Sequence, residues 1–393
     1  MIHPLNFFRA QSLLPALMFA FLLPIHADYT TTGNLTYAKV LYSRPPENLP
    51  ETTEAANVRF ATVRAIATSN GNVYPALTDA SGAFSFSVSD GEAVDLWVYA
   101  RGANVEVVSD SESFDSYSNH YKAQLNGAPI TGGNNSDYSL TDTSVSGAYN
   151  IFDQLQRGRL FFESLGYTLP GNLLCVWSAE GTYFDPDLDI LFIREGSGLS
   201  NHDPDEFDDD IILHEFGHYL IELLGRDDSQ GGMHTVTDEY DLRLSWSEGL
   251  AHFISSAVRN NPGQIDALES NPGSTTTLAS SFYIDDELHH DSGNEVAVAN
   301  FLWNLWLDDS RSGEVFSAVF AMGDTGNWPS GTLSYGVTLD LFRDLYSATD
   351  ISAHVADLEL SYYNDDYSNY TSSQPFTLSG ENQSLTGLSF HPQ

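Results

Sequence analysis

Apolar and polar residues alternate along two segments in the first third of the chain, residues 58–65 and 84–88. Strict alternation is typical of a β-strand with one buried and one solvated face. The turn signal Asp79-Ala80-Ser81-Gly82 precedes the second segment, and residues 96–100 form an apolar run typical of a buried strand. We therefore expect residues 28–108 to form an antiparallel β domain.

One string in this region carries a family resemblance. Thr78-Asp79-Ala80-Ser81-Gly82-Ala83-Phe84-Ser85-Phe86 resembles a hairpin of the carboxypeptidase-regulatory-like, transthyretin-like β-sandwiches. The resemblance implies a β-sandwich over residues 28–108, and we assign no chemistry to it. Residues 109–144 are rich in Ser, Asn, Gly and Asp, which predicts a linker or a long polar loop.

Helical spacing begins after this polar stretch. Apolar residues between Ala148 and Leu165 fall on one broad face, and Gly166 is expected to end the helix. Two strand-like runs follow, then further helical patterns; these lie at residues 173–177, 190–193, 211–220, 289–303 and 335–364. We therefore expect an α+β domain over residues 145–371 and a polar tail over residues 372–393.

Residues 1–27 have the pattern of a secretory signal peptide. Arg9 supplies a positive start, an apolar run extends from Leu13 to Leu23, and Ile25-His26-Ala27 is an acceptable cleavage site. No later stretch approaches the roughly 18–20 apolar residues that span a bilayer. The sequence therefore predicts a secreted, extracellular protein without a membrane anchor in its mature form.

Composition restricts the function further. The chain has 54 acidic residues against 15 basic ones, for a net charge of −39, and phosphate-rich partners such as nucleic acid would be repelled. Its single cysteine, Cys175, excludes an internal disulfide and a metal site built only from cysteines. Because Cys175 falls in a strand-like run, we expect a buried core thiol.

The segment His214-Glu215-Phe216-Gly217-His218 fits the H-E-x-x-H pattern. Histidines at i and i+4 project from one face of a helix, close enough to bind one tetrahedral zinc ion. Zinc lowers the pKa of bound water towards about 7, and a carboxylate at Glu215 can accept its proton as general base. The sequence thus predicts His214 and His218 as zinc ligands.

A catalytic zinc usually has a third protein ligand. The metzincin pattern is excluded, since Ile221 and Leu224 occupy the positions where it requires Gly and His. Glu248-Gly249-Leu250-Ala251-His252-Phe253 resembles the E-G-x-A-x-F/Y helix of gluzincin metallopeptidases. The resemblance implies Glu248 as the third ligand, on a second helix that we expect it to begin; Glu222 and Glu239 are alternatives.

The gluzincin resemblance has a departure and an extension. His252 stands where thermolysin- and fungalysin-like enzymes typically have Asp, and His234 is expected to be a solvated loop residue. Residues 289–303 are similar to the H-x-x-G-E-V-x-A-x-x-L-W stretch of fungalysins. That similarity implies His290 as a catalytic residue that donates to the oxyanion, with His289 and Tyr283 as alternatives.

Two acidic groups make Ca²⁺ a second candidate cofactor beside Zn²⁺. They are the set Asp185, Asp187 and Asp189 and the cluster at residues 203–210. Neither group fits the twelve-residue EF-hand pattern, and the second is also explained by acids at the start of a helix.

Together these features predict an α+β protein with an N-terminal β-sandwich and a zincin-type catalytic domain. The expected function is that of a secreted zinc metallopeptidase acting on protein or peptide substrates. The alternative is an exported zincin-fold protein that binds zinc without peptidase activity and acts through its β-sandwich. Glu215 separates them, because a structural zinc site needs no carboxylate beside the metal and usually fills its fourth position with Cys or His.

Overall fold

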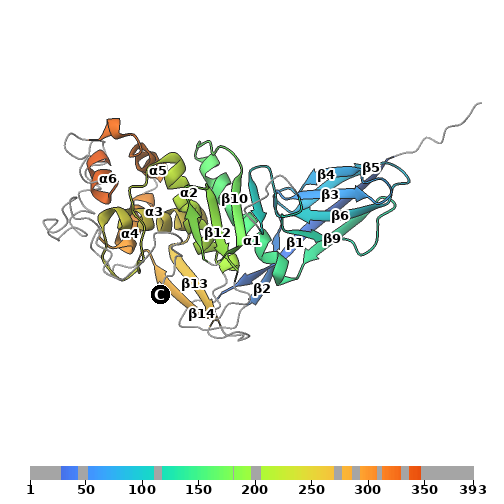
Figure 1. The fold of residues 1–393 in the computed structure, drawn as a ribbon, viewed down its shortest axis with the longest axis horizontal. Coiled ribbons are helices and arrows are strands. Elements are labelled where there is room, and N and C mark those ends of the chain that lie inside the picture. Colours follow the sequence, from blue (N-terminus) through green and yellow to red (C-terminus); the bar gives the residue numbers. More distant parts are fainter. Residues whose placement is uncertain are drawn as a thin grey trace, which may run out of the picture.

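The computed structural model describes residues 28–42, 52–109, 117–179, 181–195, 205–269, 277–285, 293–307, 312–328 and 336–346. The first strands of the chain lie at one end of an elongated molecule, and the helices of the C-terminal half lie at the other (Figure 1). The chain is therefore of the mixed α+β class, as the sequence predicts. Within these ranges no helix is both long and apolar enough to cross a membrane.

Two four-stranded sheets form the N-terminal end. The first contains β2 (Thr52–Asn57), β1 (Tyr29–Leu41) and β5 (Ala83–Val88) in that order, with β9 (Asn135–Leu140) also paired to β1. The second has the order β4 (Val73–Leu77), β3 (Thr62–Ala67), β6 (Val94–Tyr99) and β8 (Lys122–Gln124). All pairings in these sheets are antiparallel except that of β1 with β9, which is parallel.

The alternating segments of the sequence form strands with one buried face. In β3, Val63 and Ala65 are fully buried while the residues between them are partly exposed, and β5 alternates in the same way. The apolar side chains of both sheets belong to one hydrophobic cluster. The strand prediction at residues 84–88 is thus confirmed. The prediction at residues 58–65 is correct only from Thr62, because residues 58–61 are not strand and Phe60 has a positive φ of 59°.

The polar stretch at residues 109–144 differs from its expected form. Two strands, β8 and β9, lie within it and pair with β6 and β1. In β9 only Leu140 is buried, so its sequence carries almost no hydrophobic signal of a strand. The preceding strand β7 (Val105–Val108) is fully buried and pairs instead with the next sheet along the chain.

A central sheet connects the two ends of the molecule. Its strands have the order β11 (Tyr183–Asp185), β12 (Ile190–Arg194), β10 (Leu173–Ala179) and β7. Strand β10 is parallel to both of its neighbours, whereas β11 is antiparallel to β12. Cys175 in β10 is buried, and burial raises the pKa of its thiol, which agrees with the expected core role.

Helix α1 (Thr143–Ser164) crosses from the N-terminal sheets to the C-terminal half. Asp142 caps it by accepting a hydrogen bond from the Ser144 backbone N–H (3.0 Å). Gly166 follows with φ 95°, in the left-handed region that favours glycine at a helix end. Both ends therefore lie close to where the apolar spacing and Gly166 predict them.

The C-terminal half is mainly helical. It contains η1 (Asp205–Phe207), α2 (Asp209–Leu224), α3 (Leu242–Arg259), β13 (Gly263–Glu269), β14 (Thr277–Tyr283), α4 (Glu295–Leu307), α5 (Ser312–Ala321), η2 (Thr325–Asn327) and α6 (Leu339–Tyr346). Strands β13 and β14 form an antiparallel pair. Helix α6 falls within the helical segment expected at residues 335–364, of which residues 336–338 are described but not helical. Residues 347–364 and the expected tail lie outside the described residues.

Glycines allow the three central helices to approach one another closely. A Cβ placed on Gly217 of α2 would lie 2.9 Å from the Ala251 Cα of α3. A Cβ on Gly249 of α3 would lie 2.5 Å from the Glu295 carbonyl oxygen of α4. Real Cβ contacts are not this short, so both positions depend on glycine, and α3 is held tightly between α2 and α4.

Candidate metal centre

Helix α2 carries both histidines of the H-E-x-x-H motif. Asp209 and Asp210 lie in its first turn, where negative charge favours the helix dipole, and Gly225 caps its C-terminal end. His214 is fully buried and His218 is partly exposed. Their rings lie on one face of the helix with centroids 4.8 Å apart. The motif therefore forms the helical pair that its spacing predicts.

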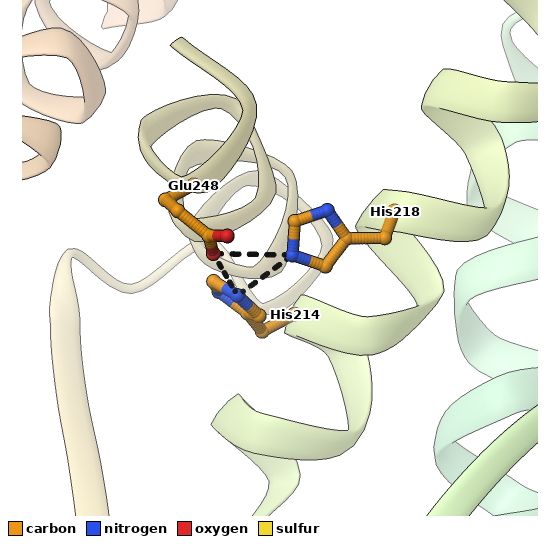
Figure 2. A group of neighbouring side chains, drawn as sticks. All are labelled: His214, His218 and Glu248. Atoms are coloured by element: carbon orange, nitrogen blue, oxygen red, sulfur yellow. Dashed lines mark hydrogen bonds and ion pairs between the residues drawn. The ribbon is translucent and has the colours of Figure 1, made fainter. Parts of the chain in front are cut away.

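Helix α3 brings Glu248 to these histidines. Figure 2 shows the carboxylate of Glu248 pointing from α3 towards the two imidazoles of α2. Its Oε2 lies 3.1 Å from His214 Nε2 and 3.2 Å from His218 Nε2, and the two Nε2 atoms are 3.1 Å apart. Among the described residues, these three form one of two groups whose ligand atoms converge within 4.8 Å.

Glu248 does not begin its helix, contrary to the expectation. Helix α3 begins at Leu242, where Asp241 caps it by accepting a hydrogen bond from the Arg243 backbone N–H (3.0 Å). Glu248 is therefore in the second turn, with its backbone fixed by helical hydrogen bonds on both sides. The apolar run after Glu248 indicates a helix but not where the helix begins. The start of α3 is set by the capping residue Asp241.

The triangle of donor atoms fits a small divalent cation. Metal–ligand bonds of about 2.0–2.1 Å at tetrahedral angles place two ligand atoms about 3.3 Å apart, close to the three edges observed. Hydrogen bonds alone satisfy such a triangle poorly, because each proton lies along only one edge. Two imidazole nitrogens and one carboxylate oxygen are also a donor set that suits zinc.

The charges around the triangle also favour a cation. Burial and the charge of His252 lower the pKa of His214 to about 3, so its ring is neutral and can offer a nitrogen lone pair to a metal. Burial alone would lower the pKa of His218 as well, but Glu248, Glu215 and Asp227 raise it to about 9. A site that stabilises a proton so strongly is one that also stabilises a bound cation.

A chain of buried side chains supports His214. Its Nδ1 lies 3.2 Å from His252 Nδ1, and His252 Nε2 lies 3.6 Å from Glu295 Oε1. Burial alone would raise the pKa of Glu295, but the charge of His234, the hydrogen bond from His234 and the nearby ring of His252 lower it to about 2. His252 itself cannot supply a negative charge. The next side chain in this chain of contacts, Glu295, supplies it.

His234 is part of this support rather than a solvated loop residue. Its side chain is only 10% exposed, its Nδ1 lies 2.7 Å from Glu295 Oε2, and its Nε2 lies 3.6 Å from Glu248 Oε1. No sequence pattern indicates this burial, because His234 lies in an irregular glycine-containing segment. Glu295 was also missed as a partner, since an acid at the start of a helix has a sufficient local explanation.

A second pair of residues supports His218. The Ser247 hydroxyl lies 3.4 Å from His218 Nδ1 and donates a hydrogen bond to Asp227 Oδ2 (2.7 Å). Burial raises the pKa of Asp227 although Ser247 and His218 act against the rise. Both ligand histidines thus have a polar partner at the nitrogen that faces away from Glu248.

Glu215 is buried beside the triangle, with 1% of its surface exposed. The Phe184 backbone N–H of β11 donates a hydrogen bond to its carboxylate. Its Oε1 has no hydrogen-bond partner among the described residues. Burial raises the pKa of Glu215 to about 7, although the positive charge of His218 acts in the opposite direction. Glu215 can therefore gain and lose a proton near neutral pH.

The remaining sequence candidates lie elsewhere. Glu222 and Glu239 are exposed and do not join the cluster of metal-binding atoms found among the described residues. Tyr283 ends β14 with 41% of its surface exposed. His289 and His290 lie outside the described residues, so the oxyanion role stays a prediction.

The carboxylates of a second acidic group lie close together near the start of α2. Carboxylate oxygens of Asp205, Asp208 and Asp266 lie within 4.8 Å of one another, and all three residues are buried. Asp266 comes from β13, outside the acidic cluster that the sequence marked. Asp185, by contrast, accepts hydrogen bonds from the backbone N–H groups of the turn that follows it (3.0 Å each). Calcium binding stays a prediction.

No protein-family model matches the chain, and no curated protein is significantly similar to it. The chemistry of the residues and the geometry of the site are therefore the basis for assigning a function.

Proposed function

We propose that the protein is a secreted zinc metallopeptidase of gluzincin type, with an N-terminal β-sandwich and a zincin-type catalytic domain. His214, His218 and Glu248 would hold the zinc ion. The proposal is supported by the convergence of their three ligand atoms at 3.1–3.2 Å, from two helices held together by Gly217. The signal-like segment at residues 1–27 supports export.

When bound, zinc would polarise the scissile carbonyl and lower the pKa of water, as it does in other hydrolytic sites. The charge states of the surrounding residues suit this role. His214 is kept neutral by burial, and Glu248 supplies one negative charge that is held ionised: burial opposes this, but His234, His218 and His214 lower the pKa of Glu248 well below its usual range. Two histidines and one carboxylate leave room for a water molecule or substrate in a tetrahedral site.

Glu215 is the observation that carries the peptidase proposal. Its carboxylate is buried beside the ligand histidines, one oxygen lacks a hydrogen-bond partner among the described residues, and its pKa is about 7. A carboxylate with these properties can accept a proton from water and return it to a leaving amine. A purely structural zinc site would gain nothing from it, since a buried carboxylate with one oxygen left without a hydrogen bond is destabilising.

The test is degradation of casein by the mature chain beginning at Asp28. Wild type is compared with Glu215→Gln, which keeps the side-chain shape and removes the basic oxygen. Glu222→Gln, two turns along the same helix and exposed, is the matched control. Zinc content is measured in all three proteins. We expect about one zinc per chain in each, cleavage by wild type and the control, and loss of at least 10³-fold in kcat/KM for Glu215→Gln.

Three results would contradict the proposal. If all three proteins hold zinc and none cleaves any protein or peptide pool, the non-peptidase alternative is favoured, and a ligand of the N-terminal sheets becomes the next target. If Glu215→Gln cleaves as fast as wild type, Glu215 is not the general base. Loss of zinc from wild type would instead show that the three-ligand site is wrong.

A further inference from the structure

A buried polar network joins the N-terminal sheets to the helix that carries the zinc motif. The Tyr37 hydroxyl of β1 donates to Asn150 Oδ1 of α1 (3.0 Å), and Asn150 Nδ2 donates to Asp209 Oδ1 of α2 (3.0 Å). All three residues lie at the contact between β1, α1 and the first turn of α2. The network has a structural role that is separate from the metal centre.

Three basic side chains of this region each have an aspartate partner. The pairs are Lys39 with Asp209, Arg59 with Asp153 (2.6 Å), and Arg259 with Asp210 (2.6 Å). Each pair places a charge-assisted hydrogen bond where the surroundings are partly or fully desolvated. The basic side chains are thus neutralised in place, with one exception.

The exception is Arg157, one turn after Asp153 on α1. Its Nη2 donates to the Arg259 carbonyl oxygen (3.2 Å), and no carboxylate in the described part of the chain lies within 4.0 Å of its guanidinium. Burial lowers the pKa of Arg157, and Asp209 opposes that change only in part. An arginine has five N–H donors in a planar fork, so most of its donors are left for another acceptor.

Arg157 lines a cavity of about 300 Å³ between β1, α1 and the start of α2. Its lining includes the basic residues Lys39 and Arg259 and the apolar residues Val40, Phe207 and Ile265. Residues 208–210 also line it, but Asp209 and Asp210 are neutralised by Lys39 and Arg259. The carboxylate of Asp208 converges instead with those of Asp205 and Asp266. The lining therefore holds three basic and three acidic side chains, and Arg157 is the basic one without a carboxylate partner in the described part of the chain.

We propose that this cavity binds an apolar monocarboxylate, whose carboxylate pairs with the guanidinium of Arg157 and whose aliphatic part lies against Val40, Phe207 and Ile265. The planar fork of arginine matches a carboxylate in two parallel hydrogen bonds. Either a free short-chain acid or the C-terminal carboxylate of a peptide has this chemistry. The site does not depend on the metal centre or on peptidase activity.

The test is calorimetric titration of the mature chain with isovalerate and with N-acetyl-Ala-Leu, each beside its neutral amide. We expect both acids to bind at least 10-fold more tightly than their amides. The source is the free acid if isovalerate binds more tightly, and a peptide C-terminus if N-acetyl-Ala-Leu does. Glu248→Gln is titrated in parallel, because a carboxylate bound at the metal centre would be lost in this variant and one bound at Arg157 would be retained.

Two substitutions of Arg157 complete the test. Arg157→Met removes the charge and should weaken binding of the acids at least 10-fold, while Arg157→Lys keeps the charge without the fork and should give an intermediate affinity. Without ligand, Arg157→Met should melt at or above the wild-type temperature, since it removes an unpaired, desolvated charge. Arg259→Met should melt lower, because it leaves the buried Asp210 without its partner.

Four outcomes would overturn the proposal, three of them differences in binding between ligands or variants. In the first, wild type binds an acid and its amide with equal affinity. In the second, wild type and Arg157→Met bind the acid with equal affinity. In the third, binding of the acid is lost in Glu248→Gln but kept in the Arg157 variants. Absence of binding by wild type at millimolar acid would overturn it as well.

Discussion

Gly217 of α2 lies against Ala251 of α3 so closely that a Cβ on Gly217 would be 2.9 Å from the Ala251 Cα. This contact lies between the two ligand-bearing segments, since His218 follows Gly217 directly and Glu248 precedes Ala251 by one turn. The separation of α2 and α3 at this point sets the 3.1–3.2 Å edges of the donor triangle. A glycine in the middle of a zinc-motif helix is thus a geometric requirement of the site.

Gly217→Ala should therefore weaken zinc binding even though alanine is the better helix former. Helix propensity alone would stabilise the variant by about 0.5–1 kcal/mol. The added methyl group would push α3 away and lengthen the distances from Glu248 to the histidines. We expect at least a 10-fold loss of zinc affinity, measured by competition with a chromophoric chelator. Gly127→Ala, where an added Cβ meets nothing within 4 Å, is the control; equal zinc affinity in both variants would contradict this account.

His252→Phe should lower zinc affinity about 10–100-fold, the usual effect of removing a partner of a ligand histidine. The substitution keeps a ring in the buried position and removes the nitrogen 3.2 Å from His214 Nδ1. His120→Phe is the control, because His120 is also a buried histidine but pairs with Glu106 in another part of the fold. If both variants bind zinc equally well, the chain from Glu295 through His252 to His214 does not support the metal.

The pKa of Glu215 predicts how stability of the zinc-free protein depends on pH. Burial raises this pKa from the ordinary value of 4.5 to about 7, so the folded protein favours the protonated carboxyl. The stabilisation from Glu215 is complete below about pH 4.5 and is lost as the pH rises through about 7. Glu215→Gln, which mimics the protonated form, should therefore stabilise the chelator-treated protein at pH 8 by about 3 kcal/mol.

At pH 4 the same substitution should have almost no effect, because Glu215 is then protonated in both folded and unfolded states. Denaturant unfolding at the two pH values measures the difference. An equal effect of Glu215→Gln at pH 4 and pH 8 would show that the carboxylate is not buried as described.

Removal of zinc by a chelator should abolish activity and lower the melting temperature, and added zinc should restore both. Binding to the folded state alone stabilises a protein by about 4 kcal/mol when free ligand exceeds the dissociation constant 1,000-fold. Scanning fluorimetry at increasing free zinc checks this. In Glu248→Gln the melting temperature should respond to zinc only at concentrations at least 10-fold higher; an identical response would exclude Glu248 as a ligand.

Much of the C-terminal half could be predicted because its signals are local. The apolar spacing of α1, the strand-like runs of β10 and β12, and the acids before α2 each report the structure of their own segment. The pair His214 and His218 is likewise fixed by helix geometry once α2 forms. These features need no knowledge of distant contacts.

The parts that were missed depend on distant contacts or on polar strands. His234, Asp227 and Glu295 join the surroundings of the donor triangle only through tertiary packing, and nothing in their own segments indicates that they are buried. Strands β8 and β9 are held by backbone pairing with β6 and β1, not by a hydrophobic face of their own. Hydrophobic periodicity cannot report such strands.

The most direct test of the central claim is the zinc content of the purified mature chain. Wild type and Glu248→Gln are each exposed to one equivalent of zinc and passed through gel filtration. Their zinc content is then measured by inductively coupled plasma mass spectrometry. The account predicts about one zinc per wild-type chain and a much lower value for the variant. A wild-type chain that retains no zinc, or a variant that retains as much as wild type, would contradict it.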